Sequence, residues 1–230
     1  MDTRNLRPIT SMCASAAALF CLFMAAPALA LDFTVHSYDL GEKISVAGHG
    51  DVWTAELTVS LEGVADDVAS FCVDLDTYIS RGSYPTIGVY DAHSAPAGAA
   101  DAPSGTRDFA WASHVMVTYG HDVDALAADM GVTRDQAITG VQAAIWDRLY
   151  GAPIVDASSM SAGARLVFND IVADHGVADY AKGGLIVDLP KNQDQIIVGR
   201  PSNAVPEPSA ALVFGLGTVV AGSFVKRRRH

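Results

Sequence analysis

Residues 133–151 read TRDQAITGVQAAIWDRLYG, the clearest structural signal in the chain. The opening four residues fit a capping box, in which the Thr133 hydroxyl and the Gln136 side chain satisfy backbone N–H groups of the first turn. Tyr150-Gly151, with Pro153 beyond, is a typical helix stop. The stretch therefore predicts a helix over residues 133–150.

One polar side chain interrupts the apolar face of this helix. Ile138, Val141, Ile145 and Leu149 recur at helical spacing, and Gln142 lies on the same stripe. A buried amide without a partner costs about 1–3 kcal/mol. The sequence therefore predicts that Gln142 meets a hydrogen-bond partner inside the protein. Asp147 and Arg148 flank the stripe and are expected on the solvated face.

Alternating patterns on both sides of this helix predict strands. Residues 53–61 alternate apolar and polar side chains, which indicates a strand with one buried face. Shorter strands are expected at residues 32–38, 43–47, 69–75, 86–90, 184–189 and 195–198. Further helices are expected at residues 108–119, 122–130 and 161–174. Residues 92–105, rich in Ala, Pro, Gly and Ser, should form a surface loop. A strand set interrupted by helices predicts an α+β fold, a β-barrel or β-sandwich with an inserted helical subdomain.

Residues 1–30 carry the features of a secretory signal peptide. Arg4 and Arg7 form a positive start, residues 12–26 are apolar, and Ala28-Leu29-Ala30 fits a small-x-small cleavage site. The segment predicts export of the remaining chain.

Removal of this segment leaves one of the three cysteines. Cys13 and Cys21 fall inside it, and a lipoprotein site at Cys21 is disfavoured because Phe20 stands where a small residue is needed. Cys72 remains, within residues 71–75, which read FCVDL. An unpaired thiol in an oxidising compartment is either buried and inert or retained for a reaction.

Residues 201–230 form a second signal, at the other end of the chain. Pro206-Glu207-Pro208 breaks the preceding structure, residues 210–225 carry no charge, and residues 226–229 form a basic stop that contains Arg227, Arg228 and Arg229. This order predicts an apolar helix that holds the tail in the inner membrane, transiently or permanently, with the cations in the cytoplasm. Residues 31–200 are then one exported domain.

The exported region is strongly acidic. Residues 31–205 hold 24 of the 26 acidic residues but 9 of the 15 lysines and arginines, so their formal charge is near −15, against −11 for the whole chain. This balance excludes nucleic acid as a partner, because no basic patch can neutralise phosphates. No metal-ligand spacing or cofactor fingerprint is present in the sequence, so none is expected to be bound.

The expected strand through residues 71–75 separates its side chains between two faces. Cys72 and Asp74 point to one face, and Phe71, Val73 and Leu75 point to the other. Cys72 can therefore meet whatever covers the face opposite Phe71.

Cys72 and Gln142 suggest a specific reaction. A thiolate at Cys72 can attack the carboxamide carbon of Gln142, which releases ammonia and leaves a thioester. Packing supplies the high effective concentration that this step needs. Asp74 is the candidate acid or orienting group. The side chains expected to support the bond and to exclude water from it are Phe71, Trp111, Ile145 and Trp146.

The two segments together resemble the thioester domain of bacterial surface proteins, over roughly residues 60–152. In that family a cysteine in an aromatic-Cys-aliphatic-Asp strand is joined to a glutamine in a Gln-x-Ala-Ile-Trp helix. The resemblance implies a Cys72–Gln142 thioester that attaches the protein covalently, in a single turnover, to an amine-bearing surface protein or matrix polymer. Val141 departs from the family, in which Thr or Ser often precedes the glutamine.

The tail resembles the PEP-type C-terminal sorting signal of Gram-negative bacteria, which an exosortase serves. The resemblance implies an exosortase-type processing enzyme as a partner and a location at the cell surface or in the biofilm matrix. No long stalk separates the domain from the tail, which favours matrix or neighbouring-cell partners over a distant host cell.

Two other functions remain open. Cys72 can be a small buried hydrophobic residue and Gln142 a partner of a backbone carbonyl, as in a non-covalent structural protein of the exopolysaccharide matrix. A cysteine hydrolase would instead use Cys72 as nucleophile and His114 or His121 as base. The hydrolase would keep Cys72 free and turn over repeatedly.

Overall fold

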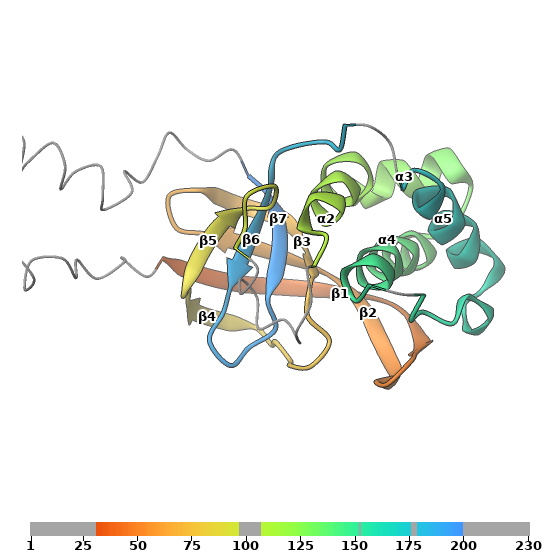
Figure 1. The fold of residues 1–230 in the computed structure, drawn as a ribbon, viewed down its shortest axis with the longest axis horizontal. Helices are drawn as coiled ribbons and strands as arrows, with labels where there is room; N and C mark the ends of the chain where they lie inside the picture. The colour runs from red at the N-terminus through yellow and green to blue at the C-terminus, as the bar shows by residue number, and fades with distance from the viewer. Residues whose placement is uncertain (1–30, 97–106, 152, 176–178, 200–230) are drawn as a thin grey trace, which may run out of the picture. The chain divides into compact units, whose positions relative to one another are not determined.

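The computed structural model describes residues 31–96, 107–151, 153–175 and 179–199 (Figure 1). The expected signal peptide at 1–30, the expected tail at 201–230 and most of the expected loop at 92–105 lie outside the described residues. Among the residues that are described, no helix combines the length and the apolar character needed to cross a membrane.

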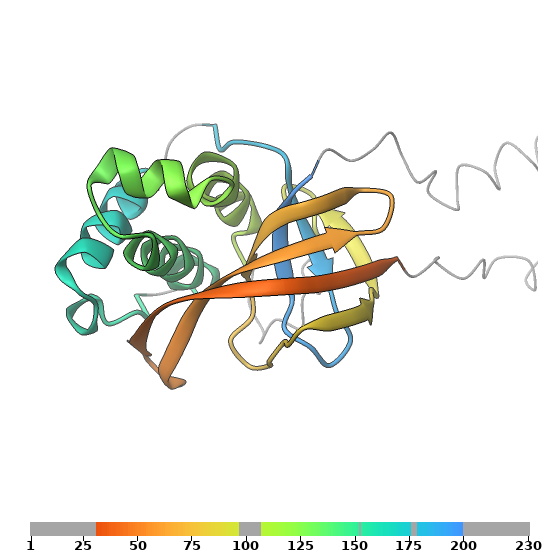
Figure 2. The same cartoon turned by 180° about the vertical axis from the view of Figure 1, so that it is seen from behind.

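The described strands form one antiparallel sheet of seven strands, in the order β4-β1-β2-β3-β7-β6-β5. The sheet curls as an open half-barrel (Figure 2). The expected β-barrel or β-sandwich with a helical insert is therefore confirmed in part, because the described strands form one curled sheet rather than a sandwich. The strands are β1 (Asp32–Val46), β2 (Gly50–Leu61), β3 (Ala65–Cys72), β4 (Gly82–Pro85), β5 (Gly88–Asp91), β6 (Gly184–Asp188) and β7 (Gln195–Val198).

The first strand is longer than expected. Two separate strands were predicted at 32–38 and 43–47, but β1 is continuous through both and pairs along its length with β2. A register shift between Leu40 and Lys43 absorbs the break in the pattern. Gly41 lies at this shift, where a Cβ atom would come within 2.5 Å of the Thr139 side chain. The irregularity therefore lets β1 pass close to the helices.

The helical block lies between β5 and β6, as the sequence predicts. It contains α2 (Phe109–Val115), the π-helical turn η1 (Met116–Gly120), α3 (Val123–Met130), α4 (Arg134–Leu149), the short 3₁₀ turn η2 (Ala157–Ser159) and α5 (Ala162–Ala173). The capping box at the start of α4 is confirmed, because Gln136 N–H donates to the Thr133 hydroxyl and Thr133 N–H donates to Gln136 Oε1.

Helix α4 is the centre of the core. Almost every residue from Ala137 to Leu149 is buried, because α5 covers one side and the long ends of β1 and β2 run along another (Figure 1, Figure 2). Gly140 allows the close approach to α5, since a Cβ atom there would come within 2.5 Å of Val167. Gln142 therefore projects from a helix that surrounding elements hold in place.

Candidate functional site

Cys72 is the last residue of β3. At this residue, one edge of the strand is paired with a neighbouring strand and the other edge is not. On one edge β3 pairs with β7, with Cys72 opposite Gln195, and Val73 N–H donates to the Asp194 carbonyl. On the other edge the pairing with β2 includes Ser70 but not Cys72. Because successive residues of a strand direct their backbone groups to opposite edges, the N–H and C=O of Cys72 point towards the β2 side.

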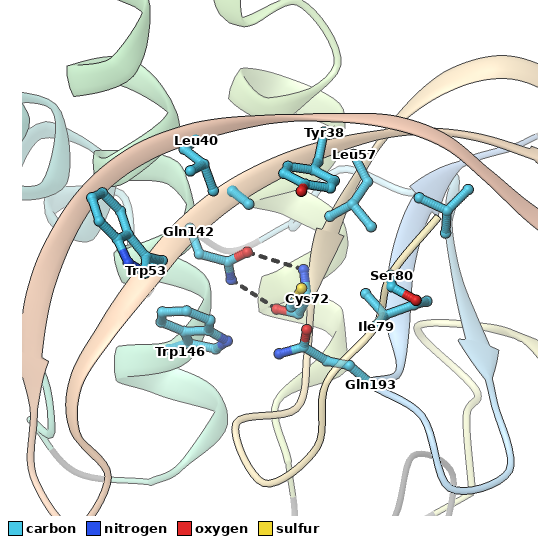
Figure 3. A pocket seen from close by; sticks show the side chains of 12 residues that line it. Tyr38, Leu40, Trp53, Leu57, Cys72, Ile79, Ser80, Gln142, Trp146 and Gln193 are labelled. Atoms are coloured by element: carbon cyan, nitrogen blue, oxygen red, sulfur yellow. Dashed lines mark hydrogen bonds between the residues drawn. The ribbon is translucent and has the colours of Figure 1, made fainter. Parts of the chain in front are cut away.

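The side chain of Gln142 fills this position in place of a strand. Cys72 N–H donates to Gln142 Oε1 at 3.0 Å, and Gln142 Nε2 donates to the Cys72 carbonyl at 2.8 Å (Figure 3). These two bonds fix which end of the amide is oxygen and which is nitrogen. The predicted partner of Gln142 is thus confirmed, and it is the backbone of Cys72.

The Cys72 thiol is buried and uncharged. Gln195 Nε2 donates to the sulfur at 3.3 Å, while Gln195 Oε1 accepts from the Ser70 hydroxyl at 2.9 Å. Burial raises the pKa of Cys72 to about 12; the hydrogen bond from Gln195 lowers it and the charge of Asp74 raises it further. Desolvation dominates, so the thiol is protonated at neutral pH.

Asp74 lies beyond the end of β3, although the sequence predicts that the strand extends through residue 75. Its carboxylate accepts from Asp76 N–H at 2.7 Å and from the Thr77 hydroxyl, which closes a tight turn. Its backbone carbonyl accepts from Gln193 Nε2 at 2.6 Å. The structure therefore gives the Asp74 carboxylate partners within its own turn, away from the Gln142 amide.

A pocket of about 190 Å³ opens beside Cys72 and Gln142. Trp146, one turn after Gln142 on α4, lines it, and Gln193 lies across from Trp146 (Figure 3). Its outer rim carries Tyr38 and Trp53, which are 46% and 57% exposed. The remaining lining residues are Val35, Leu40, Ala55, Leu57, Ile79 and Ser80.

Trp146 carries a buried donor that has no partner in the described residues. Its side chain is only 2% exposed, and Nε1 makes no hydrogen bond to the part of the protein that is described. Figure 3 shows the indole nitrogen on the edge of the ring that faces Gln193, inside the pocket.

Three other residues expected to shield the pair are buried but do not line the pocket. Phe71 lies beside Gly120 of η1, and Ile145 is fully buried within α4. Trp111 Nε1 donates to the Ala144 carbonyl at 3.1 Å. The Trp111 ring packs in a cluster of aromatic and histidine side chains, named here the Trp111 cluster: Trp111, His114, His175 and Tyr180.

The structure does not bring the candidate hydrolase bases to Cys72. His114 belongs to the Trp111 cluster, where Nδ1 accepts from Ala181 N–H at 3.1 Å and Nε2 lies 3.7 Å from Asp174 Oδ2. His121 lines a different pocket, beside Asp122. Neither histidine lines the pocket at Cys72. The sulfur of Cys72 is instead hydrogen-bonded to Gln195.

Asp147 corrects an expectation about the surface of α4. It was expected on the solvated face but is only 4% exposed. Its carboxylate accepts from Ile154 N–H at 3.0 Å and Val155 N–H at 3.4 Å. A charged residue in the last turn of the helix therefore fastens the following segment, which periodicity alone does not reveal.

Four residues outside the predicted site hold β3 and the segment that follows it in place. Leu75 N–H donates to the Tyr150 hydroxyl at 2.7 Å, and Arg107 donates to the Val73 carbonyl at 2.8 Å while its guanidinium lies over the Tyr150 ring. The missed residues are Arg107, Tyr150, Gln193 and Gln195. The polar start of an otherwise apolar strand at 195–198 was the available signal for Gln195.

No family model matches the chain, and no curated protein matches it. Among solved structures, the fold is similar to the N-terminal thioester domain of a surface protein from Clostridium perfringens, with 8% identity and a TM-score of 0.44 over 73% of this chain and 98% of that chain. It is also similar to the N-terminal domain of the Streptococcus pyogenes pilus tip adhesin Cpa, with 12% identity and a TM-score of 0.46 over 76% of this chain and 96% of that chain.

Proposed function

We propose that this chain is an exported surface or matrix protein in which Cys72 and Gln142 form an internal thioester for covalent attachment to an amine-bearing partner. The observation that carries the proposal is the pair of hydrogen bonds between the Gln142 carboxamide and the backbone of Cys72. They hold an acyl group beside the one thiol of residues 31–230, in the interior of the protein.

The same hydrogen bonds suit the closure reaction. Cys72 Sγ bonds to the Gln142 side-chain carbonyl carbon, the bond from that carbon to Nε2 breaks, and the thiol proton leaves with ammonia. As the carbonyl oxygen gains negative charge, Cys72 N–H is already its donor at 3.0 Å. Gln195 Nε2 stabilises the sulfur as it ionises. The oxyanion donor is thus the backbone of the nucleophilic residue itself.

Whether so weakly acidic a thiol can react depends on two quantities, the ionised fraction of the thiol and the effective molarity of the reaction. With a pKa of about 12, roughly one thiol in 10⁵ is ionised at pH 7. Well-oriented intramolecular reactions reach effective molarities of about 10⁵–10⁸ M, which offsets that deficit. The expected reaction is slow and occurs once per molecule, as suits a bond formed during maturation.

Attachment reverses the chemistry with a different amine. A primary amine attacks the thioester carbon, the carbon–sulfur bond breaks, and one amine proton returns to Cys72 as the thiol. Gln142 becomes a substituted amide that joins the two molecules. This proposal treats residues 1–30 as the export signal and residues 201–230 as a sorting tail, processed by an exosortase-type enzyme.

Intact mass spectrometry tests the bond directly. The purified protein is measured untreated and after methylamine, beside the Cys72→Ala variant. A live thioester makes the untreated protein lighter by one ammonia than its amino-acid sequence requires, and methylamine then adds its own mass. Cys72→Ala should show the full mass and no reaction.

Two matched variants separate the parts of the reaction. Cys72→Ser keeps the size of the side chain but replaces the thiol, and Gln142→Glu keeps the acyl group but removes ammonia as leaving group. Both should show the full mass of their sequences. A full mass and an unmodified Gln142 in the wild-type protein would contradict the proposed thioester.

One observation favours a second function, a non-covalent structural protein of the matrix. Both polar atoms of the Gln142 amide are already satisfied by the backbone of Cys72, as a neighbouring strand would satisfy it. In this case the role of Gln142 is to satisfy the backbone N–H and C=O groups at the end of β3, and Cys72 is an inert buried thiol. The full wild-type mass described above is the result this function requires.

A further inference from the structure

The proposed thioester chemistry gives no role to the indole N–H of Trp146, which lies in the same pocket. A buried indole N–H normally has an acceptor, because an unsatisfied donor costs about 1–3 kcal/mol. Trp146 Nε1 has none among the described residues, yet it faces the pocket that contains Cys72 and Gln142 (Figure 3). The position suits an acceptor atom on a molecule that enters this pocket.

Closure of the thioester would expose a second group that needs a partner. Gln142 Nε2 is the donor to the Cys72 carbonyl at 2.8 Å, and this nitrogen leaves as ammonia. The buried carbonyl of Cys72 then needs an N–H donor. An attacking primary amine supplies one, because attack follows in reverse the path by which ammonia leaves. The pocket thus offers an acceptor for the amine and, in Trp146 Nε1–H, a donor that has no partner within the described part of the chain.

We propose that the pocket selects a primary amine that carries an oxygen on the second carbon from its nitrogen. The amine donates to the Cys72 carbonyl, and the oxygen accepts from Trp146 Nε1–H. This inference rests on the proposed thioester and specifies its substrate class. The shared N–C–C–O arrangement occurs in amino sugars and in the N-terminal residue of a peptide. The ε-amine of a lysine side chain has no oxygen near it.

The size and rim of the pocket agree with this substrate class. A volume of about 190 Å³ leaves room for a small amine-bearing unit. Tyr38 and Trp53 offer partly exposed rings at the opening, against which a ring or a peptide unit can pack. The described lining residues are all uncharged, which favours an amine that enters without its proton.

Competition between two isosteric amines tests the proposal. The purified protein, first shown by mass to carry the thioester, reacts with 2-methoxyethylamine or with butylamine, which differ by one oxygen in place of a methylene. Rates are divided by those of the same amines with a small-molecule thioester. We expect a preference of about three- to tenfold for 2-methoxyethylamine, the effect of one hydrogen bond. Trp146→Phe should abolish the preference, and Tyr119→Phe, which removes a donor to Asp174 outside this pocket, should keep it.

A second measurement needs no variant. In the ¹⁵N-labelled wild-type protein, one of three indole N–H signals should shift downfield in the 2-methoxyethylamine adduct relative to the butylamine adduct. Glucosamine and glycinamide then distinguish an amino-sugar source from a peptide N-terminus by their normalised rates. Equal normalised rates for the isosteric pair, with no indole shift, would overturn the inference alone. A full mass before any amine is added would overturn the proposed thioester and the inference with it.

Discussion

The Cys72–Gln142 junction is buried, whereas the Trp111 cluster runs from the buried Trp111 and His114 to the exposed His175, and the two regions are built from different chemistry. The junction contains a thiol, a carboxamide and backbone groups, and Gln142 forms its bonds without any charge. The Trp111 cluster contains titratable groups, with His114 near Asp174 and Asp174 also bonded to the Tyr119 hydroxyl. Burial and the bond to Asp174 raise the pKa of Tyr119.

The difference bears on the proposed acyl chemistry, which only one of the two regions suits. The junction pairs the Cys72 thiol with a carbonyl carbon and a preset N–H donor, whereas the Trp111 cluster places His114 beside Asp174 and, among the described residues, contains no cysteine. His114 instead accepts from Ala181 N–H, and the neighbouring Ser113 bonds both Ala181 and Gly184, which fastens α2 to the start of β6. His114 and Ser113 therefore serve the fold here, and uncharged groups form the candidate reactive site.

The largest effect is expected from removing the amide of the junction. Gln142→Leu leaves the N–H and C=O of Cys72 unsatisfied, and should lower the free energy of unfolding by about 2–6 kcal/mol. The measurement is chemical denaturation in a Cys72→Ala background, so that no thioester contributes.

Gln142→Glu in the same background is the matched control. Its carboxylate can accept from Cys72 N–H but can donate to the Cys72 carbonyl only when protonated, so this variant should gain stability as the pH falls. A loss below about 0.5 kcal/mol for Gln142→Leu would show that the junction adds nothing to the fold.

The next effect is the pH dependence of thioester closure. Ammonia opens the thioester to the thiol and the Gln142 amide, and mass spectrometry follows re-closure once ammonia is removed. The pKa of Cys72 is about 12, so the reactive thiolate becomes about tenfold more abundant with each pH unit below that value. Closure should be about a hundredfold faster at pH 9 than at pH 7. A flat profile would show that ionisation of Cys72 does not limit closure.

A change in the Trp111 cluster should affect stability without affecting the thioester. His114→Phe keeps an aromatic ring but removes the acceptor of Ala181 N–H, at a cost of about 1–3 kcal/mol in the free energy of unfolding. His114→Asn, which can restore an acceptor, should recover part of that loss. Both variants should still lack one ammonia by mass, and a thioester lost in a folded His114→Phe would link the two regions chemically.

The smallest effect is expected from Asp74, the carboxylate nearest to Cys72 in the sequence. The charge of Asp74 raises the pKa of Cys72, so Asp74→Asn should lower that pKa and accelerate closure by less than about tenfold. The asparagine can still accept from Asp76 N–H in the turn. Closure that stops in a folded Asp74→Asn would instead assign Asp74 the role of acid in the reaction.

Local patterns in the sequence predicted much of the fold. The predicted limits of α4 agree within one residue of each end, because caps and periodicity act within a few residues of the chain. The helical block between strands was also predicted correctly. Strand β4 was missed, because Gly82–Pro85 carries no alternating pattern and is a strand only by pairing with the start of β1.

The sequence by itself determined that Cys72 and Gln142 lie on a strand and on a buried helix face, and that Gln142 needs a partner. Only the tertiary structure decided what that partner is. The pairing of β2 with β3 stops before Cys72, and α4 brings Gln142 to the backbone groups left there. The pocket, Gln195 at the sulfur and the Trp146 donor, which has no partner in the described ranges, likewise depend on contacts between residues distant in the chain. No local pattern encodes such contacts.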